Sequence, residues 1–164
     1  MIFESERLYV SRWKKEDLES LYQLFNDEAI KEFILPKLTM QETSHIFEEQ
    51  LKNYEANFPF GRYFIVEKLT KECIGLFLLK SFDDADCIEI GYSLKKERWA
   101  NGFATEIVKE ALNWLSAMKK FRTIFGVTET DNTNSQNVLL KCGFIREDNI
   151  IEDNKEMSLF ELAI

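Results

Sequence analysis

The sequence has few of the residues that mark disulfide-bonded or metal-binding proteins. Its three cysteines, Cys73, Cys87 and Cys142, form no C-x-x-C pair, and an odd number fits a reducing compartment better than a disulfide scaffold. The single histidine, His45, belongs to no H-E-x-x-H or Cys/His cluster. We therefore expect neither a bound metal nor a histidine-based catalytic triad, and we expect His45 to lie at the surface or at its boundary with the core.

Long apolar runs are also missing. None approaches the roughly 20 residues needed to span a bilayer, and Glu4, Glu6 and Arg7 stand where a signal peptide would need an apolar core. We expect a cytoplasmic protein without membrane contact. The net charge of −8 argues against nucleic-acid binding, which requires cationic neutralisation of phosphates, and it suits a cationic partner such as an amine.

No repeat, low-complexity tract or Pro/Gly-rich linker divides the 164 residues, so we expect one domain over 1–164. Apolar residues make up 45% of the chain, enough to bury a core. Alternation and helical periodicity predict a mixed α/β fold, in which helices interrupt a sheet. The expected strands are 7–13, 62–69, 73–80, 87–94, 122–128, 144–147 and 156–163; the expected helices are 15–29, one opened by the capping box at 39–42, one from 102, and 133–142.

A strand runs into a helix through the small-residue turn Ala100-Asn101-Gly102-Phe103-Ala104. The free N–H groups at a helix start, together with the helix dipole, favour an anion such as a phosphate. Gly102 permits a left-handed backbone or a close ligand approach. The alternative is an ordinary helix start with incidental lysines. The other phosphate-binding patterns, G-x-x-x-x-G-K-[ST] and G-x-G-x-x-G, do not occur.

A second polar cluster follows the 122–128 strand, in DNTNSQNVLLKCGF (131–144). It places Asn132 and Ser135 at the start of a helix that Gly143 ends. Helix capping is the alternative explanation for both residues, because Asn and Ser are good N-caps.

The two segments together resemble the GCN5-related N-acetyltransferase (GNAT) superfamily. The likeness is greatest to the branch of the ribosomal-protein alanine and serine N-terminal acetyltransferases. It lies in EIGYSL (89–94), in WANGFATE (99–106), and in Asn132, Ser135, Val138, Leu139, Lys141, Gly143 and Phe144. SERLYVSRWKKEDLESLYQLFND also resembles the opening strand and helix of that branch.

The resemblance implies the GNAT fold, with a mostly antiparallel central sheet splayed in the middle and about four flanking helices. It implies acetyl-CoA as cofactor, with its pyrophosphate on the 100–104 turn and its pantetheine arm between the 89–94 and 122–128 strands. The residues expected to bind the cofactor are Ile90, Gly91, Tyr92, Lys95, Arg98, Trp99, Ala100, Asn101, Gly102, Phe103, Ala104, Thr105, Asn132, Ser135, Asn137 and Lys141.

Two catalytic roles follow. Glu89 lies within an otherwise apolar strand and is the candidate base that takes the amine proton; the alternative is a structural ion pair with a neighbouring strand. Ser135 is the candidate to hydrogen-bond the sulfur or act as a weak acid. At the position of Leu139, several superfamily members carry a Tyr that protonates the departing thiolate. Leu has no proton to give and cannot take this role. Cys142 has no histidine partner, so a covalent acyl-enzyme is not expected.

The acceptor is expected to be a primary amine, a peptide N-terminus or a small molecule, bound near Phe33, Ile34, Tyr63 and Glu89. Transfer would be direct, within a ternary complex. A non-catalytic acyl-CoA-binding sensor or interaction module of the same fold is the alternative. Exposed terminal strands favour a homodimer.

Overall fold

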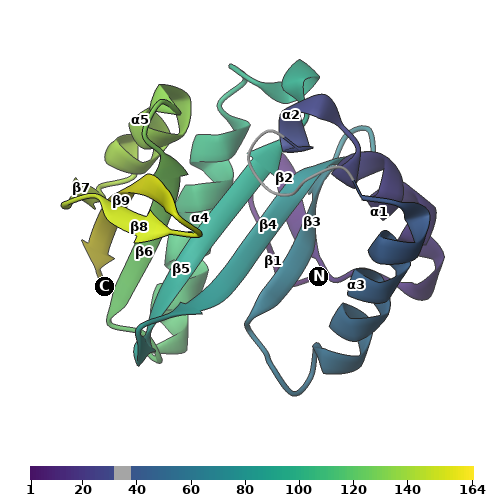
Figure 1. The fold of residues 1–164 in the computed structure, drawn as a ribbon, viewed down its shortest axis with the longest axis horizontal. Coiled ribbons are helices and arrows are strands. Elements are labelled where there is room, and N and C mark those ends of the chain that lie inside the picture. The colour runs from purple at the N-terminus through teal and green to yellow at the C-terminus, as the bar shows by residue number, and fades with distance from the viewer. Residues whose placement is uncertain (32–37) are drawn as a thin grey trace. The chain divides into compact units, whose positions relative to one another are not determined.

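The computed structural model describes residues 1–31 and 38–164 (Figure 1). The strands are β1 (Phe3–Glu4), β2 (Leu8–Ser11), β3 (Gly61–Glu67), β4 (Cys73–Phe82), β5 (Asp84–Leu94), β6 (Thr123–Glu129), β7 (Ile145–Arg146), β8 (Ile150–Glu152) and β9 (Lys155–Ala163). The helices are η1 (Lys15–Asp17), α1 (Leu18–Phe25), α2 (Glu28–Lys31), α3 (Met40–Asn53), η2 (Lys96–Arg98), α4 (Phe103–Met118) and α5 (Thr133–Lys141), of which η1 and η2 are 3₁₀ turns. The mixed α/β class predicted from the sequence is confirmed.

The strands hydrogen-bond in the order β1-β2-β3-β4-β5-β6-β9-β7, and β8 also pairs with β9. The pairs β1–β2, β2–β3, β6–β9, β7–β9 and β8–β9 are antiparallel, whereas β5 and β6 are parallel. A parallel pair needs a long crossover connection, and α4 lies in that connection. Among the described residues, no helix has both the length and the apolar character needed to cross a membrane.

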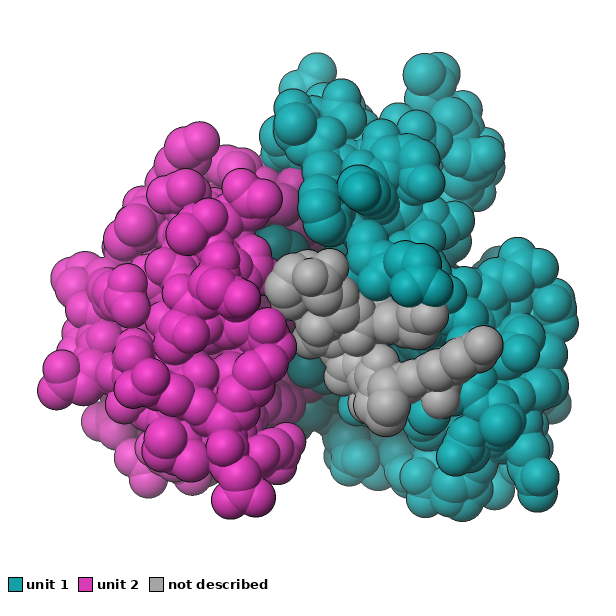
Figure 2. All heavy atoms as spheres, turned by 45° about the horizontal axis from the view of Figure 1, so that its top comes forward, with its two compact units in different colours: residues 1–78, 92–103 teal, residues 79–91, 104–164 magenta. Residues whose placement is uncertain are grey.

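Contacts within the chain define two compact units, coloured separately in Figure 2. The first unit comprises residues 1–78 and 92–103, and the second comprises residues 79–91 and 104–164. Each unit combines segments that are distant in the sequence, and β4, β5 and α4 each contribute residues to both. The single domain over 1–164 stays a prediction.

The first unit has an aromatic core around Trp13. The Trp13 ring stacks on Phe47 at a centroid distance of 5.9 Å and meets the edge of Phe25 at 6.3 Å. Tyr54 joins the helical and sheet parts of this unit, since its hydroxyl accepts a hydrogen bond from Trp13 N and donates one to Arg62 O. These contacts hold α1 and α3 against the sheet strands of the unit.

Two helix starts show how far local sequence determines this unit. The capping box is confirmed: Thr39 Oγ1 accepts from Glu42 N, and Glu42 Oε2 accepts from Thr39 N at 2.8 Å. The single helix predicted over 15–29 is wrong, because the structure breaks it at Asn26. Asn26 Nδ2 donates to Tyr22 O, and Asp27 Oδ1 accepts from the backbone at the start of α2.

The second unit is built around α4 and β9. The apolar face predicted for α4 is confirmed, since Ile107, Val108, Ala111 and Leu115 have no exposed surface. β9 pairs with β6 along its length and with β7 on its other side, which confirms the predicted antiparallel pair at the C-terminus. Strands β1 and β8 are too short to leave an alternating pattern, and the sequence did not predict them.

Candidate active site

The parallel pairing of β5 with β6 ends at Glu89. Its register joins Cys87–Glu89 to Thr123–Phe125. In the described part of the chain, no register continues from Ile90 and Gly91 to Gly126 and beyond, although both strands go on. Strand-edge groups without a partner strand can pair with an extended ligand. The splay between the two strands therefore begins beside Glu89.

Glu89 is buried and incompletely paired. Only 5% of the residue is exposed. Its Oε2 lies 3.1 Å from Lys80 Nζ, at ion-pair distance, but the contact lacks the alignment of a hydrogen bond. No described residue gives Oε2 a hydrogen bond. The Lys80 ammonium is instead hydrogen-bonded to Glu152 Oε1 at 2.6 Å. Glu89 Oε2 is therefore buried beside one cation, without an aligned hydrogen bond from a described residue.

Burial raises the pKa of Glu89 to about 7, against the opposing positive charge of Lys80. A carboxyl group with this pKa is partly ionised near neutral pH and can both take up and release a proton there. That is the range in which a general base works best. The sequence-based alternative, an ion pair with a neighbouring strand, is present as well, because Lys80 belongs to β4.

Asn132 and Ser135 open α5. Asn132 Oδ1 accepts a hydrogen bond from Ser135 N at 3.1 Å, so the capping explanation holds for the Asn132 oxygen. Leu139, one turn further, is 1% exposed and lies against β6. A Cβ built on Gly126 would be only 2.8 Å from Leu139 Cδ1. The position of the missing Tyr is thus filled by apolar packing.

Cys142 follows α5, and its Sγ lies 3.8 Å from Thr105 O in the first turn of α4. This contact brings the end of α5 beside the start of α4, within the second unit. Burial raises the pKa of Cys142, which keeps the sulfur as a thiol. A protonated thiol is a poor nucleophile, in agreement with the expectation that no covalent acyl-enzyme forms.

The turn before α4 has an unusual backbone. Ala100 has φ +59° and Gly102 has φ +77°, both in the left-handed region. Among the described residues, none accepts a hydrogen bond from the backbone N–H of Asn101 or Gly102. A Cβ on Gly102 would meet only Arg7 Nη2, at 3.6 Å. Exposed N–H groups at an open turn fit the pyrophosphate that the sequence motif implies.

We expect Ala100→Gly to raise the free energy of unfolding by about 0.5 kcal/mol, because the left-handed backbone strains Ala by more than glycine loses in chain entropy. Urea unfolding measures the change. The control is Ala104→Gly, where the residue lies in α4 and the substitution should lower stability by about 0.5–1 kcal/mol. Equal losses for the two variants would contradict a strained Ala100.

Arg7 holds this turn from the N-terminal strand region. Its Nη1 donates to Asn101 O at 3.1 Å, and its guanidinium carbon lies 4.4 Å from the centroid of the Phe103 ring. The turn is also closed internally, since Asn101 Nδ2 donates to Trp99 O at 2.8 Å. The exposed Gly102 thus lies between two residues that side-chain contacts hold in place.

Other residues of the expected cofactor site have structural partners. Trp99 Nε1 donates to Leu94 O at 2.7 Å. Arg98 Nη2 forms ion pairs with Glu72 at 2.8 Å and Glu67 at 3.3 Å. The guanidinium of Arg98, which the resemblance places among the cofactor-binding residues, is therefore already paired with two carboxylates.

The predicted site residues divide between the two units. In the first unit lie Tyr63, Tyr92, Lys95, Arg98, Trp99, Ala100, Asn101, Gly102 and Phe103. In the second unit lie Glu89, Ile90, Gly91, Ala104, Thr105, Asn132, Ser135, Asn137 and Lys141. Within the second unit, the end of α5 and the start of α4 are side by side, and Asn137 and Lys141 are exposed.

The acceptor residues need correction. Tyr63 has no exposed surface, stacks on Tyr54 and donates its hydroxyl to Pro59 O at 2.6 Å. It belongs to the core of the first unit and cannot form an accessible wall in this structure. Phe33 and Ile34 lie outside the described residues. His45 is exposed, as expected, with 76% of its side chain accessible.

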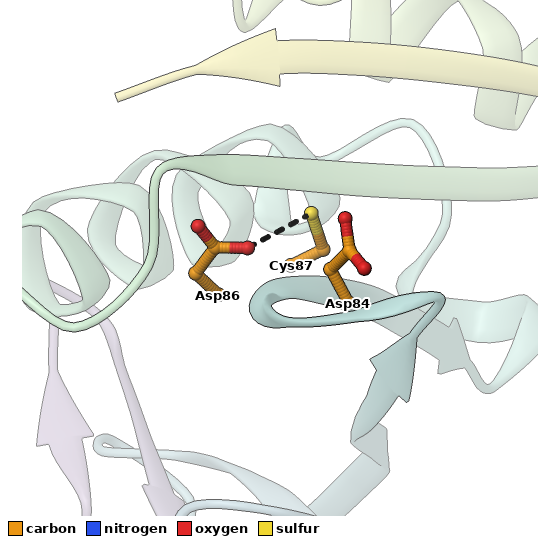
Figure 3. Close-up of side chains that lie close together, drawn as sticks. All are labelled: Asp84, Asp86 and Cys87. Carbon is orange, nitrogen blue, oxygen red and sulfur yellow. Dashed lines mark hydrogen bonds between the residues drawn. The ribbon is translucent and has the colours of Figure 1, made fainter.

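One cluster has ligand atoms close enough together for a metal ion: Asp84, Asp86 and Cys87, near the start of β5 (Figure 3). Arg122 already binds both carboxylates, with distances of 3.3 Å to Asp84 and 2.8 Å to Asp86. The two carboxylates therefore already have a cationic partner in this structure.

Three residues that matter to the site were not predicted: Lys80, Glu152 and Arg7. Lys80 breaks the apolar pattern of the 73–80 strand at its last position, which is a usable signal. Glu152 lies in β8, a strand that the sequence did not predict. Arg7 begins the strand predicted over 7–13, and nothing in its local sequence relates it to a turn 94 residues away.

Comparison with known proteins agrees with this geometry. The acetyltransferase (GNAT) domain model matches residues 7–145. The N-acetyltransferase YoaA of Bacillus subtilis is 28% identical over 149 residues, which cover 89% of this chain and 84% of the relative.

The solved structures that share this fold include two acetyltransferases. RimL, a ribosomal-protein α-N-acetyltransferase solved with coenzyme A, has a TM-score of 0.84 at 14% identity and covers 99% of this chain and 97% of its own. Spermidine N-acetyltransferase from Vibrio cholerae, solved with CoA and spermine, has a TM-score of 0.80 at 17% identity and covers 96% and 95%.

The matched span contains Arg7, the 99–103 turn, Glu89 and the start of α5. The resemblance seen in the two sequence motifs is thereby confirmed, and the chain belongs to the GNAT family of acetyl-CoA-dependent acetyltransferases.

Proposed function

We propose that this enzyme transfers the acetyl group of acetyl-CoA directly to a primary amine, with Glu89 accepting the amine proton. The observation that carries the proposal is the buried Glu89 carboxylate at the point where β5 and β6 separate, with Oε2 lacking a hydrogen-bond partner among the described residues. A buried carboxylate oxygen whose one nearby cation gives it no aligned hydrogen bond is costly for stability alone and is suited to receiving a proton.

When bound, acetyl-CoA supplies an activated acetyl thioester. In the first unit, the N–H groups of Asn101 and Gly102 would hold its pyrophosphate. In the second unit, the strand-edge groups of Ile90 and Gly91 would pair with an extended ligand and polarise a carbonyl. The residues present fit these roles, because the turn is open and its N–H groups point to no acceptor among the described residues.

The acceptor nitrogen must lose a proton as its bond to the acetyl carbon forms. A free α-amine has a pKa of about 7.7–8.0, which Glu89 can match, whereas a lysine-type amine near about 10.4 requires more assistance. The proton moves from the nitrogen to Glu89, directly or through one water. Because thiols have pKa values near about 8.5, the CoA sulfur can leave as a thiolate without the acid that Leu139 cannot provide.

The test is release of free thiol from acetyl-CoA with a panel of acceptors: peptides with free N-termini, a polyamine, an aminoglycoside and small amino compounds. The two structural neighbours act on a ribosomal protein and on spermidine, which makes the first two classes the first to try. Amine-dependent thiol release supports the proposal. Saturable acetyl-CoA binding without release for any amine would favour the sensor or interaction module instead.

The role of Arg7 gives a separate prediction. Arg7→Met removes the hydrogen bond to Asn101 and the cation–π contact with Phe103, so the turn should lose its fixed geometry. We expect the dissociation constant of acetyl-CoA to rise about fivefold, corresponding to about 1 kcal/mol, when measured by calorimetry. Arg12→Met is the matched control, because Arg12 lies 5.4 Å from the Tyr54 ring centroid in the same unit without touching the turn. Unchanged affinity in Arg7→Met would remove Arg7 from the site.

A further inference from the structure

Lys80 forms a bridge between two carboxylates in the second unit. Its Nζ lies 2.6 Å from Glu152 Oε1 and 3.1 Å from Glu89 Oε2. The three residues come from three strands: Lys80 from β4, Glu89 from the next strand β5, and Glu152 from β8, 72 residues after Lys80. Such an arrangement places one positive charge between a buried acid and a more accessible one.

The two contacts are unequal. Lys80 makes a short hydrogen bond to Glu152 and only a poorly aligned ion contact to Glu89. The side chains of Lys80 and Glu152 are each 38% exposed, whereas that of Glu89 is 6% exposed. A lysine that served only to neutralise Glu89 would make its better-aligned hydrogen bond to Glu89. A buried charge without a partner destabilises the folded state more than an exposed charge does. Here Glu152 takes the better hydrogen bond, and Glu89 is left partly compensated.

We propose that Lys80 and Glu152 are positioning residues that set the protonation of Glu89, Lys80 by favouring its ionised form and Glu152 by opposing it. This inference rests on the proposed function, in which Glu89 takes the amine proton. Lys80 from β4 and Glu152 from β8 are the charged groups that face Glu89 in the described chain. The balance between them leaves Glu89 able to exchange a proton near neutral pH.

The two charges predict shifts of opposite sign. Removing Lys80 withdraws the attractive charge, so Glu89 should ionise at higher pH. Removing the charge of Glu152 withdraws a repulsive one and frees Lys80 to align with Glu89, so Glu89 should ionise at lower pH. A purely structural role for the bridge would predict loss of stability in both variants and no such opposition.

The experiment follows the ¹³C resonance of the Glu89 carboxyl during a pH titration of the free protein, which does not depend on activity. In Lys80→Met the midpoint should move up by about one pH unit, a tenfold change in the ratio of ionised to protonated Glu89, and in Glu152→Gln it should move down by a smaller amount. Lys80→Arg keeps the charge and should stay near wild type. Lys80→Gln replaces Lys80→Met if the latter does not fold.

Two matched controls correct for net charge. Lys155→Met removes a lysine that pairs with Glu129 in the same unit, and Glu156→Gln removes an exposed carboxylate on β9. Neither should move the midpoint. Midpoints that stay at the wild-type value, or that move in the same direction for Lys80→Met and Glu152→Gln, would overturn the inference.

The pH profile of kcat/KM with an amine acceptor provides the second readout. Its acid limb should follow the carboxyl midpoint in each variant. If the NMR midpoints move in opposite directions but no variant, nor the wild type, acetylates any amine, the proposed function fails while the inference about Glu89 is supported. If activity is present and the midpoints do not move, the inference fails and the proposed function is retained.

Discussion

Replacing Glu89 with glutamine is expected to lower kcat by about 10²–10⁴-fold, the usual contribution of a positioned general base. The glutamine amide would keep the size and most of the polarity of the side chain but could not accept the amine proton. The dissociation constant of acetyl-CoA should stay within about twofold of wild type, because the pyrophosphate is assigned to the turn before α4. Steady-state thiol release measures the first quantity, and calorimetry measures the second.

The pH dependence gives the loss of kcat its chemical meaning. In wild type, kcat/KM should rise with pH through about 7, as Glu89 loses its proton. In Glu89→Gln that limb should be absent. Glu156→Gln, an exposed carboxylate in the same unit, should retain both the rate and the limb. A Glu89→Gln enzyme with wild-type turnover at every pH would show that Glu89 is structural.

The Glu89 carboxylate should reduce the stability of the folded protein at higher pH. Its pKa in the folded chain is about 7, above the ordinary value of 4.5, mainly because of burial. Below pH 4.5 the group is protonated in both the folded and unfolded states. Between pH 4.5 and about 7 the folded state holds more protons, so stability falls as pH rises. Glu89→Gln lacks this cost, and its urea midpoint relative to wild type should be higher at pH 8 than at pH 5.

Replacing Gly102 with valine is expected to weaken acetyl-CoA binding at least tenfold, through the backbone of the turn. In the free protein, a Cβ at this position would make only an ordinary contact, with Arg7 Nη2 at 3.6 Å. The cost comes from φ +77°, which a β-branched residue adopts poorly, so the turn must change conformation and redirect its N–H groups.

Gly143→Val is the matched control for this variant. Gly143 has φ +94°, and a Cβ there would meet only Leu162 Cδ1, at 3.9 Å. Both variants should lose comparable stability, on the order of 1–2 kcal/mol, from forcing valine into a left-handed backbone. Only Gly102→Val should lose acetyl-CoA affinity. Wild-type affinity in a folded Gly102→Val protein would place the pyrophosphate elsewhere.

Local patterns determined several elements of this protein. Thr39 and Glu42 begin α3 because the capping box is completed within four residues, and the buried face of α4 follows from its 3.6-residue period. Glu89 could be singled out as a carboxylate in an apolar strand. The turn at Gly102 and the start of α5 at Asn132 could also be predicted, because helix caps and left-handed glycines depend on residues close by in the sequence.

Tertiary structure decided what surrounds those residues. It placed Lys80 and Glu152 beside Glu89, bound Arg7 to a turn 94 residues away, and neutralised Arg98 with Glu67 and Glu72. It also buried Tyr63, which the sequence assigned to an acceptor wall. A sequence motif predicts the side chains and backbone groups of one continuous segment. The proton affinity of Glu89 depends instead on burial and on charges from two other strands, and only the folded chain brings these together.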